Sequence, residues 1–61
     1  MNREERLNIW NTHLANARDR LATLPQRHSI LIDSDPALYA KIENGCKDSI
    51  KIAEKNIKYY S

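Results

Sequence analysis

Residues 7–24 read LNIWNTHLANARDRLATL, and their apolar side chains recur at alternating steps of three and four. The series is Leu7, Trp10, Leu14, Ala17, Leu21 and Leu24. At 100° per residue, these six positions fall within about 100° of one another on a helical wheel. A stripe of this kind, held over almost three heptads, predicts one long amphipathic helix with a single packing face.

The residues that flank this stripe carry signals for the ends of a helix. Asn2 is a suitable N-cap, and Glu5, three residues later, completes a capping-box pattern. Pro25 disfavours helical geometry at the residue before it, Leu24. We therefore expect the first helix to span about 3–24.

A second helix of similar length is predicted to begin at Asp35-Pro36, an N-cap followed by proline at the first helical position. Its apolar residues fall within about 80° of one face: Tyr39, Ile42, Cys46, Ile50, Ala53, Ile57 and Tyr60. The expected span is about 36–60. Asn44-Gly45 is a turn signal, so a kink or break there is an alternative to a continuous helix, although the stripe keeps its phase across Gly45.

Two helices of matched length, joined by a connector over 25–35, predict an all-α, single-domain antiparallel hairpin. The connector contains Ser29-Ile30-Leu31-Ile32. A short strand there would have no partner strand to pair with. These residues are therefore expected to cap the end of the bundle or to form an extra helical turn opened by Ser29.

A chain of 61 residues can bury only a small hydrophobic core, and such chains often rely on a disulfide, a metal or a partner subunit for stability. One cysteine excludes an intrachain disulfide, and two histidines 15 positions apart argue against structural zinc. The apolar residues Leu38, Ile52 and Tyr59 lie on one line of the second helix, away from its packing stripe, and Ile9 is similarly displaced on the first. This second apolar surface predicts a homodimeric four-helix bundle, with docking onto a different protein as the alternative.

The residues that carry enzymatic chemistry are sparse. A single glycine cannot build a phosphate-binding loop or a nucleophile elbow. Cys46 lies at the centre of an apolar stripe, which favours a buried small hydrophobe over a reactive thiol. We therefore expect no catalysis, cofactor, metal or small-molecule substrate.

Basic side chains follow one flank of each predicted helix. They are Arg6, His13, Arg20 and Arg27 on the first, and Lys47, Lys51, Lys55 and Lys58 on the second. Such flanks are often solvated and paired with neighbouring acids. The functional alternative is recognition of an acidic protein surface or of a phosphate backbone.

The sequence also bears on the compartment. No stretch approaches the roughly 20 apolar residues of a membrane span, the first residues lack the apolar core of a signal peptide, and the single cysteine suits a reducing compartment. We expect a cytoplasmic protein without a membrane partner. In outline the hairpin resembles small plasmid and phage regulators that dimerise into four-helix bundles, and small proteins of this kind are often accessory factors of mobile elements.

The sequence thus predicts a non-enzymatic interaction module that regulates or inhibits a larger partner. A nucleic-acid-binding protein that uses both basic flanks is the alternative.

Overall fold

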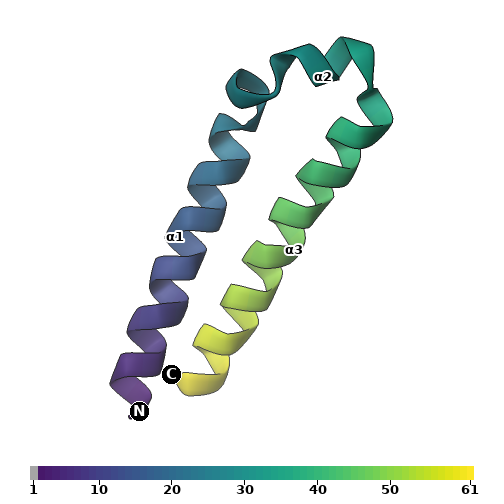
Figure 1. Ribbon diagram of the computed structural model, residues 1–61. Coiled ribbons are helices and arrows are strands. Elements are labelled where there is room, and N and C mark those ends of the chain that lie inside the picture. Colours follow the sequence, from purple (N-terminus) through teal and green to yellow (C-terminus); the bar gives the residue numbers. More distant parts are fainter. Residues whose placement is uncertain (1) are drawn as a thin grey trace.

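The computed structural model describes residues 2–61 and forms three helices, α1 (Arg3–Arg27), α2 (Ser29–Ser34) and α3 (Pro36–Tyr60). The two long helices lie side by side and antiparallel, and α2 crosses between them at one end (Figure 1). Both termini lie at the opposite end. The molecule is elongated, at 45 × 16 × 14 Å, and its two long helices form a single layer (Figure 1). The predicted all-α architecture is confirmed for the described residues.

Both long helices begin at the predicted N-cap residues, and each cap makes the expected hydrogen bond. The Asn2 side-chain oxygen accepts a hydrogen bond from the Glu5 backbone N–H at 2.8 Å. The Asp35 carboxylate does the same for the Leu38 N–H at 3.1 Å, and Pro36 opens α3. Each cap satisfies a backbone donor that the first turn of a helix leaves without a partner.

Helix α3 continues through Asn44-Gly45 without a break, and Gly45 has no positive φ. The alternative of a helix end at this pair is therefore not adopted. The apolar stripe that passes through Gly45 without a phase shift is the better predictor here, because its residues on both sides pack on the same partner helix.

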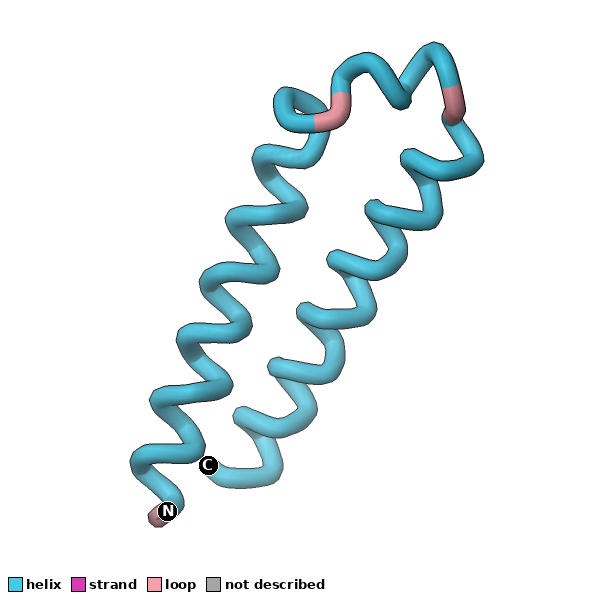
Figure 2. The backbone as a smooth tube through the Cα atoms, in the orientation of Figure 1, coloured by secondary structure: helices cyan, strands magenta, loops and turns pink. Residues whose placement is uncertain are grey.

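The predicted end of the first helix at Leu24 is wrong, and so is a connector over 25–35. Helix α1 includes Pro25 and ends at Arg27, so only His28 and Asp35 lie between helices (Figure 2). Pro25 lacks the N–H for one helical hydrogen bond, and because it lies in the last turn only Gln26 and Arg27 follow it in the helix. The turn is held by the complete burial of Leu24 and by two hydrogen bonds from the Arg27 guanidinium back to the preceding turns.

The extra helical turn predicted at Ser29 is present as α2. Ser29 is its first residue, and the residue in the cap position, His28, makes no capping bond with its side chain. Leu31 is half-buried, whereas Ile30 is exposed. The segment thus closes the end of the hairpin while leaving apolar surface in contact with solvent.

The predicted apolar stripes of the two long helices face each other, but they enclose little. Only Ala17, Leu24 and Ala53 are buried among residues 2–61, and the other members of both stripes are half-buried. The molecule exposes 4765 Å². A compact monomer of 7.1 kDa is expected to expose about 4,100 Å². The surplus of roughly 700 Å² is close to one partner's share of a standard protein interface, about 800 Å².

In the described part of the chain, no helix has both the length and the apolar character that a membrane crossing requires.

Candidate functional site: a groove between the two long helices

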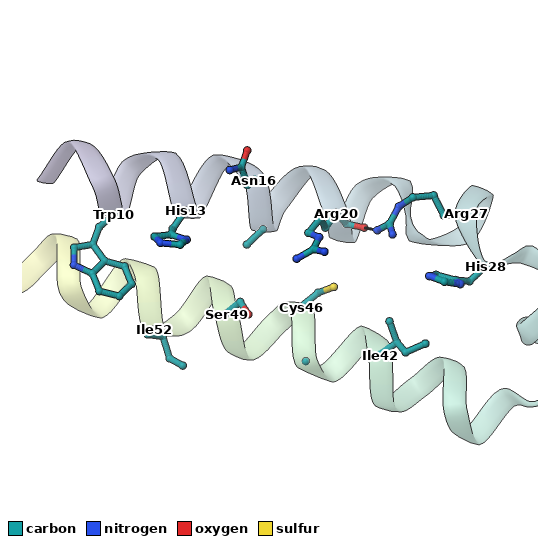
Figure 3. A pocket seen from close by; sticks show the side chains of 12 residues that line it. Trp10, His13, Asn16, Arg20, Arg27, His28, Ile42, Cys46, Ser49 and Ile52 are labelled. Carbon is teal, nitrogen blue, oxygen red and sulfur yellow. Dashed lines mark hydrogen bonds between the residues drawn. The ribbon is translucent and has the colours of Figure 1, made fainter. Parts of the chain in front are cut away.

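A groove of about 640 Å³ runs along one face of the hairpin, between α1 and α3 (Figure 3). We call this the groove face. Twelve residues line the groove: Trp10, His13, Asn16, Ala17, Arg20, Arg27, His28, Ile42, Gly45, Cys46, Ser49 and Ile52. The groove exists because the two apolar stripes meet along a narrow seam, and smaller or polar side chains border the seam on this side.

The α3 wall of the groove is largely apolar. Ile42 and Cys46 are half-buried members of the packing stripe, while Gly45, Ser49 and Ile52 are exposed beside it. Because Gly45 has no side chain, no atoms project into the groove at the middle of this wall. The wall offers contact area without a fixed charge.

The α1 wall carries aromatic and basic groups. The rings of Trp10 and His13 lie 5.3 Å apart at 42°. The side chains of Arg20, Arg27 and His28 follow along the groove toward α2 (Figure 3). Trp10 is half-buried, so it belongs to the packing seam, as predicted, and also forms one end of the groove.

The two arginines of the groove differ in how they are held. Arg27 donates from Nε to the Thr23 hydroxyl at 3.0 Å and from Nη2 to the Arg20 carbonyl at 2.6 Å. Its guanidinium is therefore fixed in place before any ligand arrives. The Arg20 side chain makes no hydrogen bond and no ion pair within residues 2–61, so all of its donors are available.

The charged residues that line the groove are all basic. No carboxylate is among the groove-lining residues. The ion pairs of the described chain are Arg18 with Glu54 at 3.9 Å and Lys47 with Glu43 at 3.5 Å. On helical wheels centred on Leu14 and Cys46, these four residues lie at about 40–100°. The groove residues of α3 other than Cys46 itself lie at about 240–320°. The acids and bases that pair thus occupy the face opposite the groove.

The predicted apolar surface is divided by the structure. Ile52 lines the groove, and Ile9 lies in an adjoining hollow that shares His13 and Asn16 with it. Leu38 and Tyr59 line neither cavity, although both are exposed. Gly45 falls on the line of Leu38, Ile52 and Tyr59, since the four positions are seven residues apart.

The predicted basic stripe of α1 is also divided. His13, Arg20 and Arg27 line the groove, whereas Arg6 lies beyond it and is engaged with α3. The Arg6 guanidinium donates to the Tyr60 hydroxyl at 3.3 Å, and its central carbon lies 5.6 Å from the centre of the Tyr60 ring. Arg6 therefore joins the free ends of the two helices.

The lysine flank of α3 does not extend the basic groove. None of its members lines the groove, and wheel positions of about 100–180° turn them outward and toward the opposite face: Lys47, Lys51, Lys55 and Lys58. The two basic flanks therefore do not merge into one continuous surface.

The prediction that Cys46 is a buried hydrophobe is wrong in degree. Cys46 lies on the packing stripe, but it is only half-buried and lines the groove. The neighbouring residue, Gly45, has no side chain that could cover the Cys46 thiol, so the thiol faces the open groove. Sequence reasoning also missed Asn16, His28 and Ser49 as groove residues, because the relevant signal is the absence of bulky apolar groups beside the seam.

The groove does not bring together a nucleophile, a base and an orienting acid, since it contains no carboxylate. Among residues 2–61, no three metal-ligating side chains gather in one place. Comparison of the chain with known protein families, curated proteins and solved structures finds no match. The groove therefore has to be interpreted from its own geometry and chemistry.

Proposed function

We propose that this chain is a small non-enzymatic interaction module that regulates or inhibits a larger protein by docking it on the groove face. The observation that carries the proposal is the groove itself, which combines an apolar wall with unpaired arginines on a molecule that exposes roughly 700 Å² more than a compact monomer. Apolar area with a few placed polar groups is the composition typical of protein-binding surfaces.

A homodimeric four-helix bundle would cover the same face and is the alternative occupant. Charge disfavours it. In a face-to-face dimer with two-fold symmetry, each copy brings Arg20 and Arg27 to the interface, and neither copy brings a carboxylate from its groove lining. Like charges placed together at an interface oppose association. A different protein that supplies acids has no such penalty.

Nucleic-acid binding, the other alternative, is supported less well by the arrangement. The lysines of α3 turn away from the arginines of α1, and Arg6 is engaged with Tyr60. A phosphate backbone would meet only a short basic row on either face, and affinity for such a backbone depends on how many charges it meets together.

The test begins with the solution mass measured by light scattering over a concentration series. A mass that stays at 7.1 kDa supports a free groove face, and a rise to twice that value assigns the face to self-association. Cys46 provides a second readout, because it is the single cysteine and lines the groove. Its rate of reaction with a thiol reagent should fall only when the groove is occupied.

The partner is then captured from an extract of the source cells by the wild-type chain and by two variants. Ile52→Glu places a charge in the groove, and the matched control Ala22→Glu places it on an exposed position of α1 that does not line the groove. The proposal predicts one protein that is retained by the wild type and by Ala22→Glu, is lost with Ile52→Glu, and protects Cys46 when added back in purified form. Circular dichroism of each variant checks that the helices are intact.

Two results would contradict the proposal. One is capture that Ile52→Glu and Ala22→Glu weaken equally. The other is retention of nuclease-sensitive material that is lost steeply as salt rises, which is the behaviour of phosphate binding.

A further inference from the structure

Gly45 is the single glycine of the chain, and it lies in the middle of a 25-residue helix. Glycine at such a position destabilises a helix relative to alanine, because the unfolded chain loses more conformational freedom on folding. Nothing in the free protein offsets this loss of helix stability. Gly45 has no positive φ, and a Cβ added there would meet nothing within 4 Å. Neither the backbone nor the packing of the hairpin requires a glycine.

The position of Gly45 suggests that a binding partner, and not the hairpin itself, requires glycine there. Gly45 lines the groove, and it lies in the exposed line between Leu38 and Ile52. A missing side chain on a helix surface allows the backbone of another element to approach closely, with larger side chains on either side to direct it. The open space above Gly45 would therefore admit the backbone of a segment that is not part of this chain.

The groove also indicates the shape and charge of that segment. Its lining runs from Trp10 of α1 to His28, directly after the end of α1, which corresponds to about 27 Å at 1.5 Å per residue. A helix of about 18 residues has that length. Its apolar side would meet Ile42, Cys46 and Ile52, and carboxylates on its flank would meet the free Arg20 and the fixed Arg27.

We infer that the groove binds an acidic amphipathic helix of the partner, which packs its backbone closely against Gly45 and directs carboxylates to Arg20 and Arg27. This inference rests on the proposed function and names the chemistry of the occupant. Binding of an amphipathic helix by its apolar face, with charge on its flank setting specificity, is an established mode of peptide recognition.

The probe is a displayed library of 18-residue helical peptides. Leucine, isoleucine and alanine vary along one stripe, and each flanking position is randomised among Glu, Gln and Lys. The full chain is immobilised through its N-terminus, which leaves Cys46 unmodified. Peptides retained by the chain should be enriched in Glu on one flank and should carry Ala where the helices approach most closely. An enriched peptide is then synthesised, and its affinity is measured by fluorescence anisotropy.

Gly45→Ala gives the decisive comparison, because stability and binding should move in opposite directions. The melting temperature should rise by about 4–8 °C, since alanine is the better helix former by about 1 kcal/mol. The affinity for the peptide should fall about tenfold or more, because the new methyl group occupies the contact point. The matched control is Asn44→Ala, which also raises helix propensity but lies outside the groove lining. It should raise the melting temperature and leave the affinity unchanged.

Arg20→Gln tests the charge. It should weaken peptide binding several-fold and slow association, whereas Arg18→Gln on the opposite face should do neither. Added salt should reduce the difference between the wild type and Arg20→Gln.

The inference is overturned if no peptide is retained above background, if the retained peptides show no acidic flank, or if Gly45→Ala binds as tightly as the wild type. Its failure is distinguishable from failure of the proposed function. A partner that protects Cys46 and is lost with Ile52→Glu would still establish docking in the groove, by a segment of different chemistry. Absence of any such partner would remove both.

Discussion

Leu24 should contribute more to stability than any other large side chain, and Leu24→Ala measures how much of the hairpin depends on it. Leu24 is the largest fully buried side chain of the described residues, at 0% exposure. Replacing a buried leucine by alanine costs about 2–5 kcal/mol, the sum of the lost transfer energy and the cavity left behind. The seam is only one layer deep and can partly close over the cavity, so we expect about 3 kcal/mol.

This loss is large against what a chain of 61 residues has available. At about 0.05–0.15 kcal/mol per residue, its total unfolding free energy is roughly 3–9 kcal/mol. Leu24→Ala should therefore lower the melting temperature by roughly 12–24 °C, at 4–8 °C for each kcal/mol. Urea denaturation measures the free energy and thermal denaturation the melting temperature. Both are followed by circular dichroism at 222 nm and by the fluorescence of the single tryptophan, Trp10.

The matched control is Ile30→Ala, at a side chain that is 80% exposed. It should change stability by no more than about 0.5 kcal/mol. A cost below about 1 kcal/mol for Leu24→Ala would refute the reasoning, because it would mean that the end of the hairpin near α2 is not packed around this residue.

Three further predictions concern the ends of the helices. Pro25→Ala should stabilise the chain by about 1 kcal/mol, seen as a higher melting temperature, because it restores a helical hydrogen bond in the last turn of α1; a lower melting temperature would show that proline is needed there. Asp35→Ala should cost about 1 kcal/mol in urea denaturation because the Leu38 N–H loses its cap, and Asp35→Asn should recover most of it. A double-mutant cycle of Arg6→Ala and Tyr60→Ala should give a coupling of about 0.5–1 kcal/mol, and a coupling of zero would remove their role in joining the helix ends.

Much of the fold could be predicted because it depends on patterns within each helix, namely the apolar stripe and the N-cap. The stripes from Leu7 to Leu24 and from Tyr39 to Tyr60 specify the faces that pack, and the caps at Asn2 and Asp35 specify where the helices begin. The end of α1 could not be predicted in this way. The local preference of Pro25 opposes helix, and it is outweighed by the burial of Leu24 and the hydrogen bonds of Arg27.

The candidate site was only partly visible in the sequence. Ile9, Ile52, Arg20 and Arg27 carry the signals of an apolar or basic surface, but nothing along the chain says that Arg20 and Ile52 border the same groove. In the sequence, Asn44-Gly45 indicated a possible kink or break in the helix. In the structure, Gly45 instead forms part of the groove wall. These relations join residues of different helices, and no periodicity within one helix contains them.

The amino-acid pattern alone therefore accounts for two amphipathic helices, their starting points and their antiparallel pairing, since each follows from interactions within a few turns or from one apolar stripe per helix. The packing of α1 on α3 accounts for the rest. It divides the charges between two faces, leaving Arg20 and Arg27 beside an apolar wall and the paired acids on the other side. The physical reason is that the rotation of each helix about its axis is set by how the stripes fit together, and that rotation selects which flanking residues become neighbours.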